Sequence, residues 1–270
     1  MSKVVVLVAF VAAILVVEAL GCVIPAKDYT PRVLSPVPSA YMRSSDLPTA
    51  FSWCKHPDGN SYCSYVRNQN GPQFCGACWL FAGLGALSDR VSIARKGQWP
   101  QFDLSPQHVL NCGQDAGSCK GGDVGKLYEW ASKNGVVDDT CQIYEAKDGT
   151  CSAINTCRDC SMAKGCWAVQ EGRFTRYFAK EHGRVSGEDN MLTELSRGPI
   201  ACYLNAASSF INYAGGIITD LKSDAALHAV TIVGWDVTAD KTKVWLGRSS
   251  FGSFWGEDGY FRIVRGSNAI

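Results

Sequence analysis

The stretch NQNGPQFCGACWLF, residues 68–81, places two cysteines three positions apart and follows them at once with apolar residues. A Cys-x-x-Cys pair of this kind has several possible roles. It can be a redox pair, half of a zinc site, two ordinary disulfide cysteines, or one structural cysteine beside one reactive cysteine. Which of these applies depends on the compartment, on the local structure and on the partners that the rest of the chain offers.

The N-terminus indicates the compartment. Lys3 precedes fourteen consecutive apolar residues at 4–17, and Glu18 interrupts the run. A membrane span needs about 20 such residues. The shorter run, followed by small residues, predicts a secretory signal peptide at 1–21 that is cut before Cys22. A retained signal anchor and a bacterial lipoprotein are the alternatives. A chain on the secretory pathway, bound for a lysosome-like vesicle or the outside of the cell, should have most of its 13 cysteines in disulfides.

The composition excludes some classes of partner. Lys and Arg total 26 against 25 Asp and Glu, a net charge of +1, and charged residues make up 19% of the chain. Nucleic-acid binding would require a basic stripe with interleaved aromatic residues, and the sequence contains none. We expect no membrane partner after removal of the signal.

The order of predicted elements indicates an α+β fold. Residues 22–45 are rich in proline and polar residues and should form an extended segment that folds only against another part of the chain. The globular part should start near 46–48. Apolar periodicity and caps predict helices first and strands afterwards. The helices are expected at 78–96, 105–111, 123–134 and 188–197, and the strands at 199–204, 227–235, 243–248 and 260–264. This order favours two lobes over alternating βαβ units.

The two cysteines of the opening stretch stand in different local contexts. A thioredoxin-like pair would lie in a βαβ unit, which is not predicted here. A zinc site would need a second pair, and Cys157 and Cys160 could provide one, but secreted disulfide-rich chains disfavour it. Two structural cysteines remain possible. Cys78 lies where a helix should begin, and the helix dipole favours a thiolate there, whereas Cys75 lies outside the helix. Glycines 83 and 85 weaken that predicted helix by up to ~1 kcal/mol each.

A nucleophilic thiolate needs a base, and the chain has four histidines. His56 and His182 stand in polar surroundings, and His108 lies on a predicted helix. His228 stands in AALHAVTIVGWD, at the start of an apolar strand. Taken alone, a histidine in such a strand is more often a packed core residue than a base.

Several motifs together resemble papain-like cysteine peptidases. CGACW fits the Cys-Gly-[Ser/Ala]-Cys-[Trp/Tyr] signature, and LHAV, VGW and WLGRSSFGSFWGEDGY follow in the order of that family's His-Ala-Val and Asn-Ser-Trp-Gly blocks. The resemblance implies a helical left lobe, roughly 65–165, and a β-barrel-like right lobe, roughly 166–270. The active-site cleft would lie between them, in a peptidase domain of 47–270.

The same resemblance implies the catalytic residues. Cys78 is the implied nucleophile, and His228 its partner. Ser249 stands where the family has the asparagine that orients the histidine, and Phe251 where it has a shielding tryptophan. An oxyanion hole would combine the Cys78 N–H with a glutamine side chain. Gln69 and Gln73 are the candidates. We prefer Gln69, nine residues before Cys78, because that spacing fits the family with a three-residue insertion.

The insertion points to the cathepsin X (cathepsin Z) branch of the family. RNQNGPQFCGACW, DRVSIARKGQWP, LNCGQDAGSCKGG, GVVDDTCQIYEAKDGTC and RGPIACYL all resemble that branch. It implies a carboxypeptidase with peptide or protein substrates, a monomer without metal or organic cofactor, made as a zymogen. In a short pro-segment, 22–46, Cys22 would bond Cys78. Gly121 and Gly122 would bind substrate backbone. Asn70 replaces a histidine thought to clasp the substrate's C-terminal carboxylate.

The departures at 249, 251 and 70 leave two other functions open. One is a catalytically impaired, peptidase-like binding protein, and the other is an endopeptidase without carboxylate recognition. The resemblance also implies a set of disulfides, with Cys54 and Cys63 pairing by default and Cys202 left alone. The implied pairs are Cys75–Cys119, Cys112–Cys151, Cys141–Cys157, Cys160–Cys166 and Cys54–Cys63.

Overall fold

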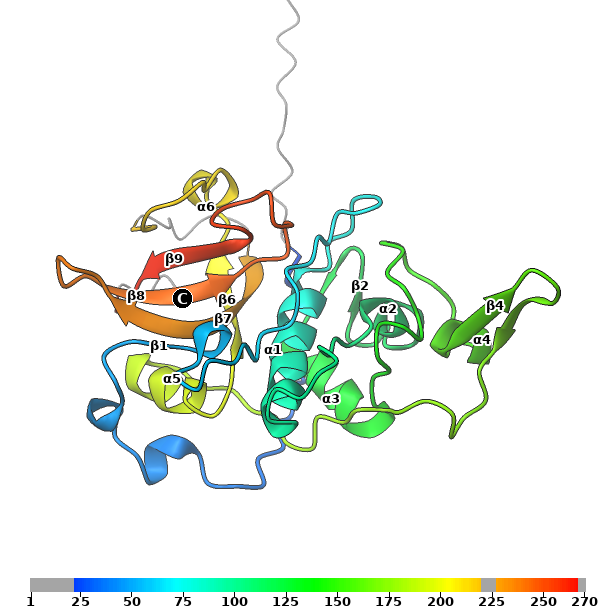
Figure 1. Cartoon of the computed structure of the whole chain (residues 1–270), viewed down its shortest axis with the longest axis horizontal. Helices are drawn as coiled ribbons and strands as arrows, with labels where there is room; N and C mark the ends of the chain where they lie inside the picture. Colours follow the sequence, from blue (N-terminus) through cyan, green and yellow to red (C-terminus); the bar gives the residue numbers. More distant parts are fainter. Residues whose placement is uncertain (1–21, 220–226, 267–270) are drawn as a thin grey trace, which may run out of the picture.

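The structure, a computed structural model, describes residues 22–219 and 227–266. The signal peptide expected at 1–21 lies outside the described residues. The main antiparallel sheet, with two short helices beside it, lies on one side of the molecule and three helices lie on the other, with the long helix α1 (Cys78–Ala94) between the two sides (Figure 1). The expected α+β, two-lobed architecture is confirmed.

Helix α1 is the centre of the molecule. It begins at Cys78 as predicted and ends at Ala94, after which Lys96 and Gly97 turn the chain with φ of 56° and 65°. The two glycines inside it allow close packing. A Cβ on Gly83 would lie 2.5 Å from the Leu127 side chain, and one on Gly85 would lie 2.8 Å from the Arg248 guanidinium. The loss of helix propensity therefore allows both lobes to approach α1 closely.

Two of the other helices begin at side-chain caps where the sequence predicts a helix start. The Ser105 hydroxyl accepts a hydrogen bond from the His108 N–H at 3.1 Å, and the Asp123 carboxylate accepts one from the Lys126 N–H at 3.0 Å. These bonds satisfy first-turn N–H groups that have no partner within the helix. The two helices capped in this way are α2 (Pro106–Cys112) and α3 (Val124–Asn134). The remaining helices are α4 (Ala153–Thr156), α5 (Glu188–Leu195) and α6 (Ser208–Ile211).

The main sheet has five antiparallel strands. Strand β7 is the longest, and it pairs with β6, β8 and, at its far end, the short β1, while β9 pairs with β8. In the part of the chain that the structure describes, the sheet stays open and does not close into a barrel. The bounds are β1 (Phe51–Ser52), β6 (Ile200–Asn205), β7 (Leu227–Val237), β8 (Lys243–Arg248) and β9 (Tyr260–Val264).

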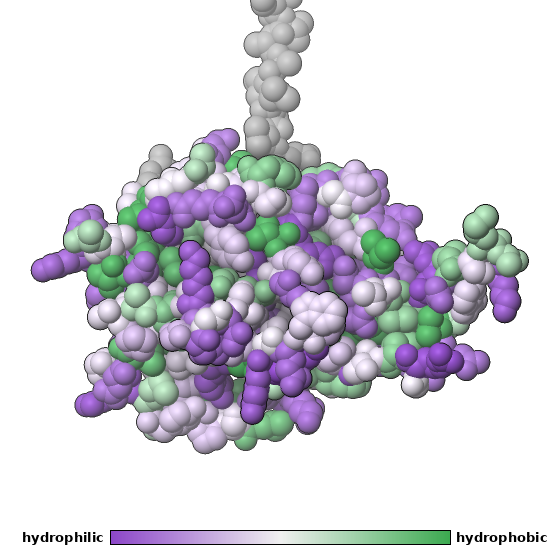
Figure 2. Space-filling model, in the orientation of Figure 1, coloured by the Kyte–Doolittle hydropathy of each residue, from purple (hydrophilic) through white to green (hydrophobic). Residues whose placement is uncertain are grey.

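Two small hairpins lie outside the main sheet. Strands β2 (Gly117–Ser118) and β3 (Gly121–Gly122) form one beside α1. Strands β4 (Arg158–Ser161) and β5 (Gly165–Ala168) form the other, which projects from the end of the molecule (Figure 1). Hydrophilic and hydrophobic side chains are interspersed over the face seen in Figure 2, and the projecting hairpin carries the exposed Met162.

Each lobe has its own hydrophobic core, and α1 contributes to the first. Trp79, Leu80 and Leu84 are almost completely buried between α1, α2 and α3. Trp235, Ile232 and Phe261 form the centre of the second core, within the sheet. Because α1 and β7 each belong to a packed core, the backbones of Cys78 and His228 are held firmly in place.

Residues 22–46 cross the surface of both lobes. Val23 forms an isolated β-bridge with Gly122 in the helical lobe, and Arg32 forms one with His182. Farther along, the Ser44 hydroxyl donates to the Asp189 carboxylate at the start of α5. The segment has only short 3-10 turns, η1 (Pro38–Ala40) and η2 (Ser44–Asp46), and a third turn, η3 (Trp53–Lys55), follows it. It is held by contacts with the rest of the chain, as the proline-rich sequence suggests.

Twelve of the cysteines form six disulfides. The four structural pairs implied by the resemblance and the default pair Cys54–Cys63 are present, the sixth is the Cys22–Cys78 bond that the resemblance also implies, and Cys202 is free. Within 22–219 and 227–266, the helices are all too short or too polar to cross a bilayer.

Candidate active site

Cys78 is the first residue of α1 and is completely buried. The residue before it, Ala77, gives the helix no side-chain cap, and Cys78 stands in the first turn, where the helix dipole is positive. The backbone N–H of Ala229 donates a hydrogen bond to this sulfur at 3.3 Å. Both features stabilise negative charge on the sulfur once it is free to ionise.

Cys22 is bonded to the Cys78 sulfur in this structure. The two residues form a disulfide with their Cα atoms 5.7 Å apart, and Cys22 is 3% exposed. The Gly122 N–H donates to the Cys22 carbonyl at 3.2 Å, and the Ile24 N–H donates to the Gly122 carbonyl at 2.8 Å. Backbone of the N-terminal segment therefore lies on β3, the strand of Gly121 and Gly122 that was predicted to bind substrate backbone.

His228 lies on β7, opposite Leu204 of β6, and is 1% exposed. Its Nδ1 lies 3.5 Å from the Cys22 sulfur, and its Nε2 lies 3.5 Å from the Ser249 hydroxyl. Burial lowers the pKa of His228 to about 3. The imidazole is therefore neutral while Cys78 is held in the disulfide, because no anion offsets the desolvation of a cation.

Ser249 and Phe251 surround the far side of the imidazole. Ser249 follows β8 and is fixed by a hydrogen bond from its N–H to the Gly259 carbonyl at 3.0 Å. Its hydroxyl is at the outer limit of hydrogen-bond length from His228. The Phe251 ring stacks on His228, with centroids 4.6 Å apart and planes 24° apart. The two replacements in the family motif thus leave the ring well covered but weakly oriented.

Gln69 is buried, and both ends of its amide are engaged. Nε2 donates to the Cys75 carbonyl at 3.0 Å, and Oε1 accepts from the Ser250 hydroxyl at 2.7 Å. Gln73, the other candidate, is exposed in the turn before Cys75. The structure therefore places Gln69 between the loop that leads to Cys78 and the segment that carries Ser249.

Asn70 lies next to Gln69 and is half-buried. Its N–H donates to the Asn68 side-chain oxygen at 3.0 Å, and its own carboxamide oxygen accepts from the Cys75 N–H at 3.5 Å. These bonds fold the inserted loop back toward Cys75. Asn68 itself forms an isolated bridge with Phe251, so the loop and the segment after β8 meet at the site.

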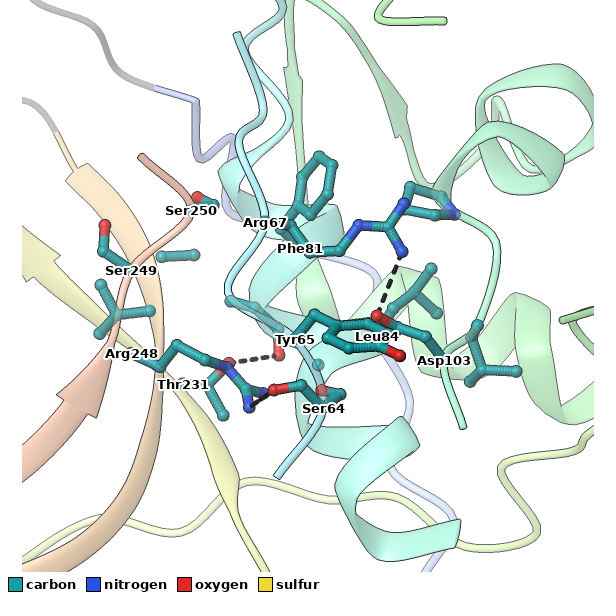
Figure 3. Close-up of a pocket in the computed structure, with 16 residues that line it drawn as sticks. Ser64, Tyr65, Arg67, Phe81, Leu84, Asp103, Thr231, Arg248, Ser249 and Ser250 are labelled. Carbon is teal, nitrogen blue, oxygen red and sulfur yellow. Dashed lines mark hydrogen bonds and ion pairs between the residues drawn. The ribbon is translucent and has the colours of Figure 1, made fainter. Parts of the chain in front are cut away.

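A buried ion pair that the sequence analysis missed joins the two lobes behind the site. Arg248, the last residue of β8, pairs with Asp89 of α1 at 2.9 Å, and the two are 4% and 0% exposed. Arg248 also donates to the Ser64 carbonyl, and Arg67 pairs with Asp103 nearby (Figure 3). A charge at the end of the apolar strand sequence KVWLGR was the available signal. Because Ser249 follows Arg248 directly, the pair fixes the backbone of Ser249 relative to α1.

One group of side chains has the composition of a metal site. In the described parts of the chain, Cys22, Cys78 and His228 bring their ligand atoms within 4.8 Å of one another, and all three are buried. The Cys-x-x-Cys of the sequence is not such a group, because Cys75 is bonded to Cys119. Cys157 and Cys160 are likewise paired elsewhere, with Cys141 and Cys166.

Comparisons with known proteins agree with this arrangement. The family model described as "Papain family cysteine protease" matches residues 47–270. The chain is 42% identical to "Cathepsin Z" of Onchocerca volvulus over 221 residues, which cover 81% of this chain and 71% of that protein. It is 34% identical to "Fruit bromelain" of Ananas comosus, covering 82% of this chain and 56% of the relative, little more than half its length.

Solved structures agree at the level of the fold. Bromelain protease from Ananas comosus, in complex with the E64 inhibitor, matches with a TM-score of 0.66 and 28% identity, covering 83% of this chain and 92% of that one. A proCathepsin B from Trypanosoma congolense matches with a TM-score of 0.75 and 23% identity, covering 93% of this chain and 83% of that one. This second likeness concerns the fold alone. The chain belongs to the papain family of cysteine proteases and is a cysteine peptidase.

Proposed function

We propose that the chain is the zymogen of a cathepsin X-like carboxypeptidase in which Cys78 is the nucleophile and His228 its partner. The observation that supports this assignment is the meeting of the two residues at one buried point. The Cys78 sulfur is bonded to Cys22, whose sulfur lies 3.5 Å from the imidazole of His228. When Cys22 leaves, the space next to Nδ1 becomes available to the Cys78 sulfur.

The reaction follows from the groups around that point. The freed Cys78 thiol transfers its proton to His228, and the resulting thiolate attacks the scissile carbonyl carbon. The helix dipole at the start of α1 and the Ala229 N–H stabilise the thiolate. The imidazolium then gives its proton to the leaving amine, and water releases the acyl group from the Cys78 sulfur.

Two further residues assist in this scheme. The Gln69 amide and the Cys78 N–H stabilise the oxyanion that forms during attack. The Gln69 amide is held by Ser250, and turning its Nε2 away from the Cys75 carbonyl makes it available to the oxyanion. Ser249 orients His228 through Nε2.

The pro-segment 22–46 keeps the zymogen inactive in two ways. Cys22 blocks the nucleophile covalently, and the backbone from Cys22 to Ile24 uses the hydrogen-bonding groups of Gly122 that would bind substrate. Reduction of the disulfide and removal of the segment ahead of Leu47 would free both. The six disulfides and the cathepsin relatives support a location on the secretory pathway, in a lysosome-like vesicle or outside the cell.

The preference for the substrate's C-terminus rests on the inserted loop. In this scheme Asn70 donates a neutral hydrogen bond to the terminal carboxylate. Its loop is fixed next to Cys75, three residues before the nucleophile. A neutral donor binds a carboxylate more weakly than a charged one does.

The test uses the chain after removal of residues 22–46, so that neither the Cys22 bond nor the backbone of the segment covers the site. This processed chain is treated with a thiol-directed peptidase inhibitor and analysed by peptide mapping. We expect one label, on Cys78. The variant Cys202→Ser is the control for the other free thiol and should be labelled equally. Absence of label on Cys78 would contradict the peptidase mechanism and favour the impaired binding protein.

A second assay tests the carboxypeptidase preference of the chain after removal of residues 22–46, without inhibitor treatment. It compares cleavage of matched peptides with free and amidated C-termini. We expect faster cleavage of the free-acid peptide, and Asn70→His should increase the difference. Equal cleavage of both peptides would identify an endopeptidase without carboxylate recognition.

A further inference from the structure

We propose that the full chain, once the Cys22–Cys78 disulfide is reduced, binds one Zn²⁺ ion between Cys22, Cys78 and His228. The site exists only while the pro-segment is present, because the segment supplies one of its three ligands. Binding of the metal rests on the geometry alone. Its consequence, a second latent state of the zymogen, rests on the proposed function.

One ligand–ligand distance already matches that of a zinc site, and the second needs only the disulfide to open. Zinc holds sulfur at about 2.3 Å and imidazole nitrogen at about 2.0–2.1 Å in tetrahedral geometry, which separates the two ligand atoms by about 3.5 Å. The Cys22 sulfur lies 3.5 Å from His228 Nδ1. Two zinc-bound sulfurs would lie about 3.8 Å apart by the same geometry. The Cα atoms of Cys22 and Cys78 are 5.7 Å apart, so side-chain rotation alone can provide that separation.

The surroundings of the three ligands are those that metal sites use. The Ser249 hydroxyl lies beside Nε2 of His228 and can accept a hydrogen bond from an Nε2–H, which leaves the Nδ1 lone pair facing the Cys22 sulfur. The Ala229 N–H donates to the Cys78 sulfur. Such outer hydrogen bonds fix the tautomer of a ligating histidine and stabilise a ligating thiolate. With three protein ligands, a water molecule would complete the tetrahedron.

The chemical steps balance with a small-molecule thiol as the reductant. Two thiols reduce the disulfide to the Cys22 and Cys78 thiols and become one disulfide themselves. Zinc then displaces one proton from each cysteine and binds the neutral imidazole, so two protons are released per ion. Thiolate and imidazole ligands favour zinc over magnesium or calcium.

The pro-segment holds Cys22 in position without the disulfide. The Gly122 N–H and carbonyl pair with Cys22 and Ile24, and the Ala26 N–H donates to the buried Asp123 carboxylate at 3.1 Å. These bonds raise the local concentration of the Cys22 thiol near Cys78 and His228. Zinc enters when the Cys22 end of the segment lifts, since all three ligands are buried when it is seated.

The experiment measures metal binding and not activity. Purified full chain is reduced with a phosphine, freed of reductant under anaerobic conditions, and titrated with Zn²⁺ against a chromophoric chelator. Thiol counting by mass spectrometry confirms that Cys22 and Cys78 are reduced and the other disulfides intact. X-ray absorption then reports the ligands, with zinc–sulfur distances of about 2.3 Å expected.

The expected result is one tightly bound ion in the reduced chain and none in the oxidised chain. Cys22→Ser and His228→Ala should each weaken binding by more than about tenfold, because removal of even an outer hydrogen-bond partner of a zinc ligand costs about that much. Cys202→Ser should leave binding unchanged, because this free thiol is not among the three residues whose ligand atoms lie together. Equal binding by the oxidised chain, or unchanged affinity in Cys22→Ser, would overturn the proposal.

The zinc site and the peptidase mechanism fail separately. Labelling of Cys78 by the thiol-directed inhibitor together with absent zinc binding would leave the peptidase proposal intact and refute the metal site. Zinc binding together with absent labelling and cleavage would support the metal site and refute the peptidase proposal. If the zinc site and the peptidase mechanism are both correct, zinc should slow the labelling of Cys78 in the reduced full chain. The same zinc concentration should not slow labelling of the full chain that carries Cys22→Ser.

Discussion

The sulfur of Cys22 lies 3.5 Å from Nδ1 of His228 while it is bonded to Cys78. The N-terminal segment thus places a sulfur of its own beside the proposed base while it covers the proposed nucleophile. The low pKa of His228, about 3, follows from burial of the imidazole. A Cys78 thiolate would supply the missing negative charge and raise that pKa once Cys22 has left.

Ser249 should support less activity than the asparagine of the family would. Its hydroxyl is 3.5 Å from His228, and one weak hydrogen bond contributes about 0.5–1.5 kcal/mol, or up to about tenfold in rate. We expect Ser249→Asn to raise kcat by up to about tenfold and Ser249→Ala to lower it by a similar factor, with KM little changed. Steady-state kinetics of the processed variants check this, and a higher kcat in Ser249→Ala would contradict an orienting role.

Gln69 should be needed for turnover, and Gln73 should not. Removal of one side-chain donor from an oxyanion hole lowers kcat by about 10²–10³. We expect Gln69→Ala to fall in that range. Gln73→Ala, an exposed glutamine in the same loop, is the matched control and should stay within about twofold of the unmodified enzyme. A large loss in Gln73→Ala with little loss in Gln69→Ala would reverse the assignment.

The Arg248–Asp89 pair should matter for stability because both charges are buried. Asp89→Asn leaves the guanidinium without its charged partner, which typically destabilises a protein by about 3–5 kcal/mol. Replacing both residues with apolar ones, Asp89→Leu with Arg248→Met, removes the uncompensated charge and should be much less harmful. Urea unfolding of the three proteins measures the difference. Similar destabilisation by the single and double changes would show that packing, and not charge, dominates.

His108 should make the protein less stable in acid. It is buried on α2 against Trp130, and burial, reinforced by the positive charge of Arg176, lowers its pKa to about 4. In the unfolded chain its pKa is about 6.5, so between these values the unfolded state binds more protons. Stability is therefore fully present above about pH 6.5 and is lost as the pH falls toward 4, by roughly 3 kcal/mol.

The variant His108→Gln separates this effect from other acid-sensitive groups, because glutamine does not titrate. We expect the free energy of unfolding of the variant to depend less on pH between 6.5 and 4. Equal pH dependence in the two proteins, measured by urea unfolding in matched buffers, would rule out His108 as the cause.

The regular elements near the site could be predicted because local signals agree there. Helix α1 begins at Cys78 as expected, Ser105 and Asp123 cap the next helices, and β7 carries His228 within the predicted strand. These features depend on periodicity and capping, which act over a few residues. The short β1 and the β4–β5 hairpin were not predicted, because two to four residues carry too little pattern.

The contacts that orient the site could not be predicted, because they join residues distant in sequence. The bond from Ser250 to Gln69 spans 181 positions, and the Arg248–Asp89 pair spans 159. Nothing local in either segment specifies the partner. Arg248 at the end of an apolar strand did indicate a buried charge that needs a counter-ion, but the sequence offers many acidic residues and no means to choose Asp89.

The central claim is that a Cys78 thiolate is held by the imidazolium of His228, and the pH dependence of Cys78 alkylation tests it most directly. The measurement uses the chain after removal of residues 22–46, with and without His228→Ala, and an uncharged alkylating reagent. A histidine-paired thiolate has a pKa of about 3–4, whereas a free cysteine has one of about 8.5. The account predicts rapid alkylation of Cys78 down to about pH 4 with His228 present, and a shift toward about pH 8.5 in His228→Ala. Alkylation that follows a pKa of about 8.5 in both proteins would contradict it.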